Sequence, residues 1–102
     1  MQKNKPQNID PIIIQNFNDL IEALNQGRKN IIIKRSFVCT YSIILPEDVK
    51  IKGEIQENGE LPLISFIDTD GFGVSSNNEI TDLNIDTAAQ KKLYIQPLTL
   101  KI

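Results

Sequence analysis

Asp68 and Asp70 are separated by a single residue. In this sequence of 102 residues, no other pair has a spacing better suited to acid–base catalysis. If the segment is extended, alternate side chains face the same way, so both carboxylates would point to one side. Carboxylates about 5–10 Å apart are the arrangement that glycoside hydrolases use. However, Gly71-Phe72-Gly73 follows directly, and aspartate beside glycine is typical of a turn. We therefore predict that Asp68 and Asp70 are turn residues, and we keep them only as weak catalytic candidates.

The remaining residue types favour little other chemistry. The chain has no histidine, which is the commonest general base and metal ligand, and a single cysteine, Cys39. One cysteine forms no internal disulfide, and without histidine a Cys–His nucleophile cannot be built. Cys39 ends the apolar run Phe37-Val38-Cys39, so we predict a small side chain that is buried or half-buried. We expect no metal and no cofactor.

Charge and hydropathy exclude several classes of partner. The net charge is -2 and the pI is about 5.0, which gives no electrostatic signature of nucleic-acid binding. No apolar run is long enough for a membrane span, and the first residues lack the apolar region of a signal peptide. The chain would then be cytoplasmic, or extracellular or in the cell envelope if it is processed or cut from a longer protein. Its richness in Ile, Asn and Lys is associated with AT-rich bacterial genomes.

One helix must be positioned near the start of the chain. Residues 1–11 are polar and contain two prolines, which predicts a flexible tail, and Ile12-Ile13-Ile14 is a short strand candidate. Asn16 is a suitable N-cap residue and Gly27 a suitable C-terminal stop, so the helix is expected over 17–26. Its apolar residues recur at helical spacing on one face. These residues, which we expect to form the core of a cap, are Phe17, Leu20, Ile21 and Leu24.

After residue 30 the pattern changes to short strands separated by turns. Asn, Gly and Pro punctuate apolar or alternating runs, which we expect at 31–33, 37–39, 41–45, 49–55, 63–67, 72–74, 80–85, 93–95 and 98–102. Asn77-Asn78 fits a corner because Asn tolerates the left-handed conformation. Lys50 and Lys52 share one face of a strand, and we interpret that face as its solvated side. The polar segment 56–60 would be an insertion between coils.

A repeat is suggested by the positions of four isoleucines. Ile33, Ile51, Ile67 and Ile85 follow one another at nearly even spacing. Such spacing of short strands favours a β-solenoid, in which each coil buries its apolar interior against the next. The chain is thus predicted to be mainly β, with a single β-helix domain over 12–102 that could be the N-terminal part of a longer protein. A β-sandwich, a small barrel or a mixed α+β fold are the alternatives.

The order of these features resembles the N-terminal end of a right-handed parallel β-helix of the pectin-lyase-like class. The stretches that carry it are "FNDLIEALNQG", "IIIKRSFVCTYSIILPEDVKIKGE" and "GFGVSSNNEITDLNID". The resemblance implies that the helix caps the open end of the solenoid. "DTDG" is similar to the "NTDG" element of polygalacturonase-like glycosidases. One coil later, however, only Asp86 is present, and the histidine of such sites is missing.

Two functions are compatible with this pattern. The first is a non-catalytic β-helix module for capping, binding or assembly, with a polysaccharide or protein ligand. The second is the N-terminal fragment of a polysaccharide-active enzyme, a glycoside hydrolase or polysaccharide lyase, with its active site on missing coils. Whether the chain is an enzyme stays open, and the non-catalytic module is favoured. The strand-like ending predicts a homodimer through an uncovered edge formed by Leu93, Tyr94, Ile95, Leu98 and Leu100.

Overall fold

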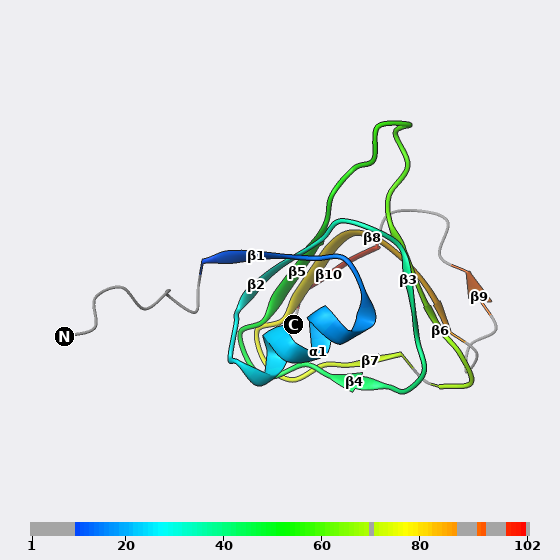
Figure 1. Ribbon diagram of the computed structural model, residues 1–102. Coiled ribbons are helices and arrows are strands. Elements are labelled where there is room, and N and C mark those ends of the chain that lie inside the picture. Colours follow the sequence, from blue (N-terminus) through cyan, green and yellow to red (C-terminus); the bar gives the residue numbers. More distant parts are fainter. Residues whose placement is uncertain (1–9, 70, 88–91, 94–97, 102) are drawn as a thin grey trace.

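The computed structural model describes residues 10–69, 71–87, 92–93 and 98–101, and it is mainly β with one short helix (Figure 1). The helix is α1 (Phe17–Asn25). The strands are β1 (Pro11–Ile14), β2 (Asn30–Ile33), β3 (Phe37–Cys39), β4 (Ile43–Ile44), β5 (Lys50–Gly53), β6 (Leu63–Phe66), β7 (Phe72–Gly73), β8 (Glu79–Thr87), β9 (Lys92–Leu93) and β10 (Leu98–Lys101). Pro11 already belongs to β1, so this strand begins at the last residue of the predicted tail.

The strands form three sheets whose ladders are mostly parallel. Sheet A contains β1, β2, β5, the first part of β8 and β10, and sheet B contains β3, β6, the second part of β8 and β9. Sheet C pairs β4 with β7. Of the strands that the structure describes, only β9 and β10 run antiparallel to their neighbour, β8. The described strands do not close into a barrel, and parallel ladders differ from the antiparallel sheets of a β-sandwich.

The spacing of paired residues differs from the predicted period. Ile31 pairs with Ile51, and Ile51 pairs with Ile80, so the second step along the chain is much longer than the first. The predicted even spacing is therefore wrong, and Ile33 lies opposite Gly53 rather than Ile51. The physical reason is that the connections between strands vary in length, and apolar alternation does not show which strands pair.

The apolar core lies inside the three sheets. In Figure 1 the backbone follows three sides of a triangle, with β2 and β5 on one side, β3 and β6 on the second, and β4 and β7 on the third. Alternate residues of β2, β5 and β6 point inward, as the period of two requires. The buried apolar residues are mainly aliphatic: Ile14, Leu20, Ala23, Ile31, Ile33, Cys39, Ile43, Leu45, Val49, Ile51, Ile64, Phe66, Ile80, Leu83 and Ile85.

Helix α1 begins at the predicted residue, Phe17, and ends at Asn25, one residue before the predicted end. The Asn16 side chain accepts a hydrogen bond of 2.8 Å from the Asp19 backbone N–H, which confirms the N-cap. At the other end, Gly27 has a φ of 80° and its N–H donates to the Leu24 carbonyl oxygen. The next N–H, that of Arg28, reaches the carbonyl oxygen of Ala23. This pair of bonds is the Schellman motif, which requires a residue that tolerates a positive φ.

Strand β8 bends at a corner and thereby links two sheets. Its first part pairs with β5 and its second part with β6. Between the two parts Asp82 has a φ of 54°, in the left-handed region. A Cβ atom on Gly53 would collide with the carbonyl oxygen of Asp82, so only glycine leaves room for this corner.

Segment 54–62 projects from the sheets (Figure 1). It connects β5 of sheet A with β6 of sheet B, so it lies within one circuit of the backbone and not between successive circuits as predicted. Gln56 fixes the base of this segment to the sheets. Its Nε2 group donates hydrogen bonds of 2.8 Å to the carbonyl oxygens of Lys34 and Glu54. At its tip the backbone N–H of Glu60 donates to the side-chain oxygen of Asn58.

Candidate functional site

A groove of about 370 Å³ crosses the outer face of sheet A. It exists because β5 alternates: Val49 and Ile51 are buried, whereas Lys50 and Lys52 face outward. The inward and outward directions of these four side chains agree with the sequence prediction. Side chains of β2 and β8 continue the groove on either side of β5, so three strands form its floor.

The parallel register arranges the floor of the groove in two rows. In the first row Lys50 lies between Asn30 and Glu79 on the neighbouring strands. In the second row Lys52 lies between Ile32 and Thr81. Cross-strand neighbours on one face interact directly, so the charge of Lys50 has an opposite charge beside it.

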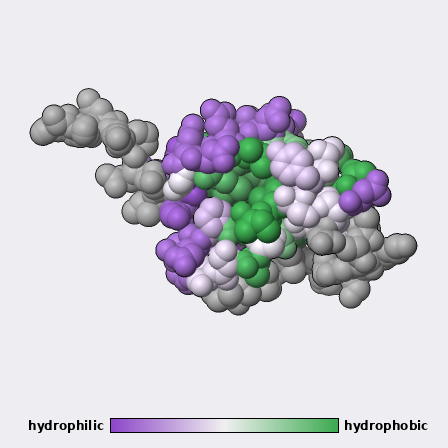
Figure 2. Space-filling view, turned by 90° about the horizontal axis from the view of Figure 1, so that it is seen from below, coloured by the Kyte–Doolittle hydropathy of each residue, from purple (hydrophilic) through white to green (hydrophobic). Residues whose placement is uncertain are grey.

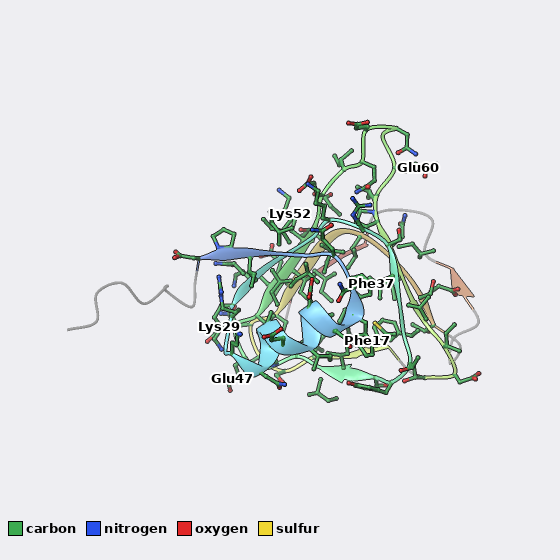
Figure 3. All side chains as sticks on the ribbon, in the orientation of Figure 1. Phe17, Lys29, Phe37, Glu47, Lys52 and Glu60 are labelled. Carbon is green, nitrogen blue, oxygen red and sulfur yellow. The ribbon has the colours of Figure 1, made fainter. Side chains whose placement is uncertain are left out.

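Lys52 differs from Lys50 in its surroundings. Its two cross-strand neighbours, Ile32 and Thr81, carry no charge. The side chain is exposed and points away from the core in Figure 3. An exposed ammonium group at the side of a groove can bind an anionic group of a ligand.

Sequence reasoning identified the shared face of the two lysines but missed the groove. Asn30, Glu79 and Thr81 line it, yet no sequence pattern connects them with Lys50 and Lys52. Only the register brings these residues together, because they come from three strands that lie far apart along the chain. The one available signal was the alternation of apolar and polar residues in β5.

Of the two aspartates, Asp68 lies outside this groove. Asp68 is exposed and has a φ of 55° in the left-handed region. Gly71 has a φ of 100°, and a Cβ atom there would lie 2.8 Å from the Cγ2 atom of Thr87. Between them the hydroxyls of Thr69 and Ser42 are hydrogen-bonded. These features fit the predicted turn, although Asp70 lies outside the described residues.

The corner predicted at Asn77-Asn78 is present. Asn77 has a φ of 58°, and its side-chain amide donates a hydrogen bond of 2.8 Å to the carboxylate of Asp48. Asn78 is buried, and its amide donates to the carbonyl oxygens of Pro46 and Val49. One asparagine therefore supplies the left-handed backbone, and the other satisfies buried carbonyl groups across the corner.

The Cys39 thiol lies in the core and is fully buried. Burial disfavours the thiolate and raises the pKa of Cys39 from 9.0 to about 12. A thiol in that state is a poor nucleophile near neutral pH, because the thiolate is the reactive form. The structure thus agrees with the predicted role of Cys39 as a small buried side chain.

Within the described part of the chain, no group of three or more His, Cys, Asp or Glu side chains could hold a metal ion. The one described helix, α1, is too short to cross a membrane.

The four residues expected to form the cap core differ in burial. Leu20 is fully buried among the core residues, together with Ala23, which the sequence pattern did not include. Phe17, Ile21 and Leu24 are only partly buried and pack against that core. Phe37 of β3 is likewise partly buried against this core.

The residues of the predicted association edge fall at the end of the chain. Leu93 belongs to β9, and Leu98 and Leu100 belong to β10, whereas Tyr94 and Ile95 lie outside the described residues. Both strands pair antiparallel with β8, so this segment folds back along the last parallel strand of its own chain. Association would then use the other edges of β9 and β10.

A second exposed surface lies over sheet C. Figure 2 views the molecule from the side of β4 and β7, and apolar side chains gather in the middle of this face. Ile44 of β4 is 69 % exposed, and Val74, which follows β7, is 41 % exposed. Tyr41 is also exposed and makes an edge-on ring contact with Phe17, with ring centroids 4.9 Å apart.

Comparison of the chain with protein-family models, with curated proteins and with solved structures finds no match. Its function must therefore be inferred from its own residues. Among the surfaces above, the groove on sheet A combines a concave shape with outward charges on a rigid sheet, which are the features of a binding site.

Proposed function

We propose that this chain is a non-catalytic binding module built on a short right-handed parallel β-helix of the pectin-lyase-like class. The parallel ladders, the inward aliphatic residues and the helix that packs against the core support this fold. The handedness and the continuity of the coils would be tested by a crystal structure. An antiparallel or left-handed arrangement would contradict the proposal.

The observation that carries the function is the groove across β2, β5 and β8. Three neighbouring strands give it a floor that does not need to be ordered on binding, which lowers the entropic cost. Its polar groups come from the outward rows of Asn30, Lys50 and Glu79 and of Lys52 and Thr81. We propose that the ligand is an extended chain that lies in this groove.

We propose an acidic polysaccharide as that ligand. Lys52 offers a positive charge beside the uncharged Ile32 and Thr81, and it suits the carboxylate of a uronic acid. No aromatic residue lines the groove in the described part of the chain, so the sugar rings would be held by hydrogen bonds and charge rather than by stacking.

The test is binding to oligogalacturonate, compared with the same oligomer after methyl esterification. We expect Lys52→Gln to weaken binding of the acidic oligomer about threefold to tenfold and to reduce its salt dependence. Lys29→Gln is the matched control, because the Lys29 ammonium group contacts the carbonyl oxygen of Glu47 at a corner and does not line the groove (Figure 3). Equal binding of both oligomers, or an equal effect of both variants, would contradict the proposal.

Incubation of the chain with the same oligomers tests the alternative function. Release of reducing ends or of unsaturated uronates by this chain would contradict the non-catalytic module. It would favour a polysaccharide-active enzyme with a catalytic site within this chain rather than on missing coils.

A further inference from the structure

Strand β1 offers a free backbone edge beside helix α1. Among the described residues, β1 pairs only with β2, at the end of sheet A. The Ile14 carbonyl oxygen accepts a hydrogen bond of 2.9 Å from the Lys34 N–H, so Ile14 faces the side of β2. Because consecutive residues of a parallel strand alternate in direction, the N–H and C=O groups of Ile13 point to the opposite edge.

A second groove, of about 300 Å³, follows this edge between β1 and α1. Ile12 and Ile13 line one side, and Asp19 and Glu22 of the helix line the other. Ile13 is 52 % exposed, so its side chain is accessible to a ligand. Among the described residues, the lining includes two carboxylates and no lysine or arginine, and this charge is complementary to a basic ligand.

The two arginines of the chain hold the ends of β1 in place. The guanidinium of Arg28 donates a hydrogen bond of 3.2 Å to the carbonyl oxygen of Asp10, just before the strand. That of Arg35 donates a bond of 2.8 Å to the side chain of Gln15, just after it. An edge that is already extended and fixed loses little further freedom when another strand is added.

We propose that the edge of β1 binds an extended basic segment of a partner protein as an additional strand. Main-chain hydrogen bonds to Ile13 would supply affinity, and lysine or arginine side chains would lie beside Asp19 and Glu22. Pro11 has no N–H, so strand addition is confined to the half of the edge around Ile13. This site is separate from the groove around Lys52 and does not depend on the proposed polysaccharide ligand.

The test uses a labelled synthetic peptide of about seven residues, an ordinary strand length, with alternating valine and lysine. Its binding to the full chain is followed by fluorescence anisotropy. We expect the peptide to bind and the matched valine–glutamate peptide to bind at least about tenfold more weakly, because like charges would meet in the groove. Equal binding of the two peptides, or no binding of either, would overturn the proposal.

Variants at Ile13 test the main-chain pairing. Ile13→Pro removes an N–H that points away from β2, so the fold should be kept while peptide affinity falls about fivefold to tenfold. Ile13→Val keeps the N–H and should bind like the unchanged chain. Circular dichroism checks that both variants are folded. A folded Ile13→Pro chain with unchanged affinity would overturn the proposal.

Two further measurements are independent of the stability of Ile13→Pro. A peptide methylated on alternate backbone nitrogens should lose binding, and unchanged binding would contradict strand addition. Glu22→Gln should weaken binding about twofold to fivefold at low salt, whereas Glu57→Gln, on the projecting segment, should not. If the chain without peptide forms a dimer that Ile13→Pro abolishes, the occupant is a second copy and the partner-segment proposal is overturned.

Discussion

The side-chain amide of Asn78 donates a hydrogen bond of 2.8 Å to the carbonyl oxygen of Pro46, far earlier in the chain. The same amide reaches the carbonyl oxygen of Val49, and its oxygen accepts from the N–H of Ser75. Asn78 is almost fully buried, so water cannot replace these bonds without a rearrangement. One side chain thus joins two successive passes of the backbone at the same corner.

We predict that Asn78→Ala lowers the free energy of unfolding by about 2–4 kcal/mol, because three hydrogen bonds are lost and buried backbone groups stay unsatisfied. Urea denaturation followed by circular dichroism measures this change. Asn77→Gly is the matched control, since glycine accepts the left-handed φ and the Asn77 side chain is exposed. Similar losses in both variants would argue against a special role of Asn78.

Leu20→Ala is predicted to destabilise the chain by about 2–5 kcal/mol, because Leu20 is fully buried between the helix and the core. Leu24→Ala should cost less, since Leu24 is only partly buried. Thermal or urea unfolding compares the two with Asn18→Ala, a change at an exposed helix position. A change of only about 0.3 kcal/mol for Leu20→Ala, far below the usual cost of a core truncation, would mean that α1 does not cap the core.

Gly53→Ala is predicted to cost about 1–3 kcal/mol, because the added methyl group meets the backbone oxygen of Asp82 and β8 must shift. Gly73→Ala is the comparison. There the methyl group would lie 2.7 Å from the Cδ1 atom of Ile44, whose exposed side chain can move aside. Urea denaturation should give a lower midpoint for Gly53→Ala than for Gly73→Ala. Equal midpoints would contradict the close approach of Gly53 to Asp82.

The buried thiol predicts a loss of stability in alkaline solution. The pKa of Cys39 is about 12 in the folded chain and near 9.0 when the thiol is solvated, so above pH 9 the unfolded state ionises first. The contribution of this thiol to stability is fully present below pH 9 and falls by at most about 1.4 kcal/mol per pH unit until pH 12. The measurement is the difference in pH dependence between the unchanged chain and Cys39→Ala, which isolates the contribution of this thiol. If the two proteins showed an identical pH dependence of stability, the predicted contribution of Cys39 would be wrong.

The dimer predicted from the chain ending is checked by its mass in solution. At micromolar concentration, light scattering or sedimentation should give twice 11.5 kDa. Leu98→Lys should then yield monomer or aggregate, because the dimer would bury a charge without a partner. A measured mass of one chain would contradict the dimer. The pairing of β9 and β10 with β8 of their own chain would then explain why the chain stays a monomer.

Local features of this fold could be predicted from the sequence, and pairings could not. The ends of α1 follow from Asn16 and Gly27, whose effects act within a few positions of the chain. The inward and outward faces of β5 follow from alternation. The alternation does not reveal how far along the chain a partner strand lies. The nearly even spacing of the isoleucines therefore suggests that Ile33 pairs with Ile51, whereas in the structure Ile33 pairs with Gly53.

The candidate site depends on that missing information. Lys50 and Lys52 could be assigned to one face, but the rows that contain Glu79 and Thr81 need the register of three strands. The corner at Asp82 could not be predicted from the sequence either. A residue with a left-handed backbone inside a strand has no reliable sequence signal when it is not glycine.

The parallel pairing described above also governs how quickly the chain can fold. Its parallel partners lie far apart in the sequence, and even the nearest, such as Pro11 and Asn30, have the whole of α1 between them, so none of these ladders can start from a tight hairpin. Each ladder requires closure of a long loop before its hydrogen bonds form, which slows the search. Refolding after a stopped-flow dilution should therefore take milliseconds to seconds, as in other small proteins dominated by distant contacts. During this time the unpaired isoleucine-rich strands are exposed to other chains, so the yield of refolding should fall as the protein concentration rises.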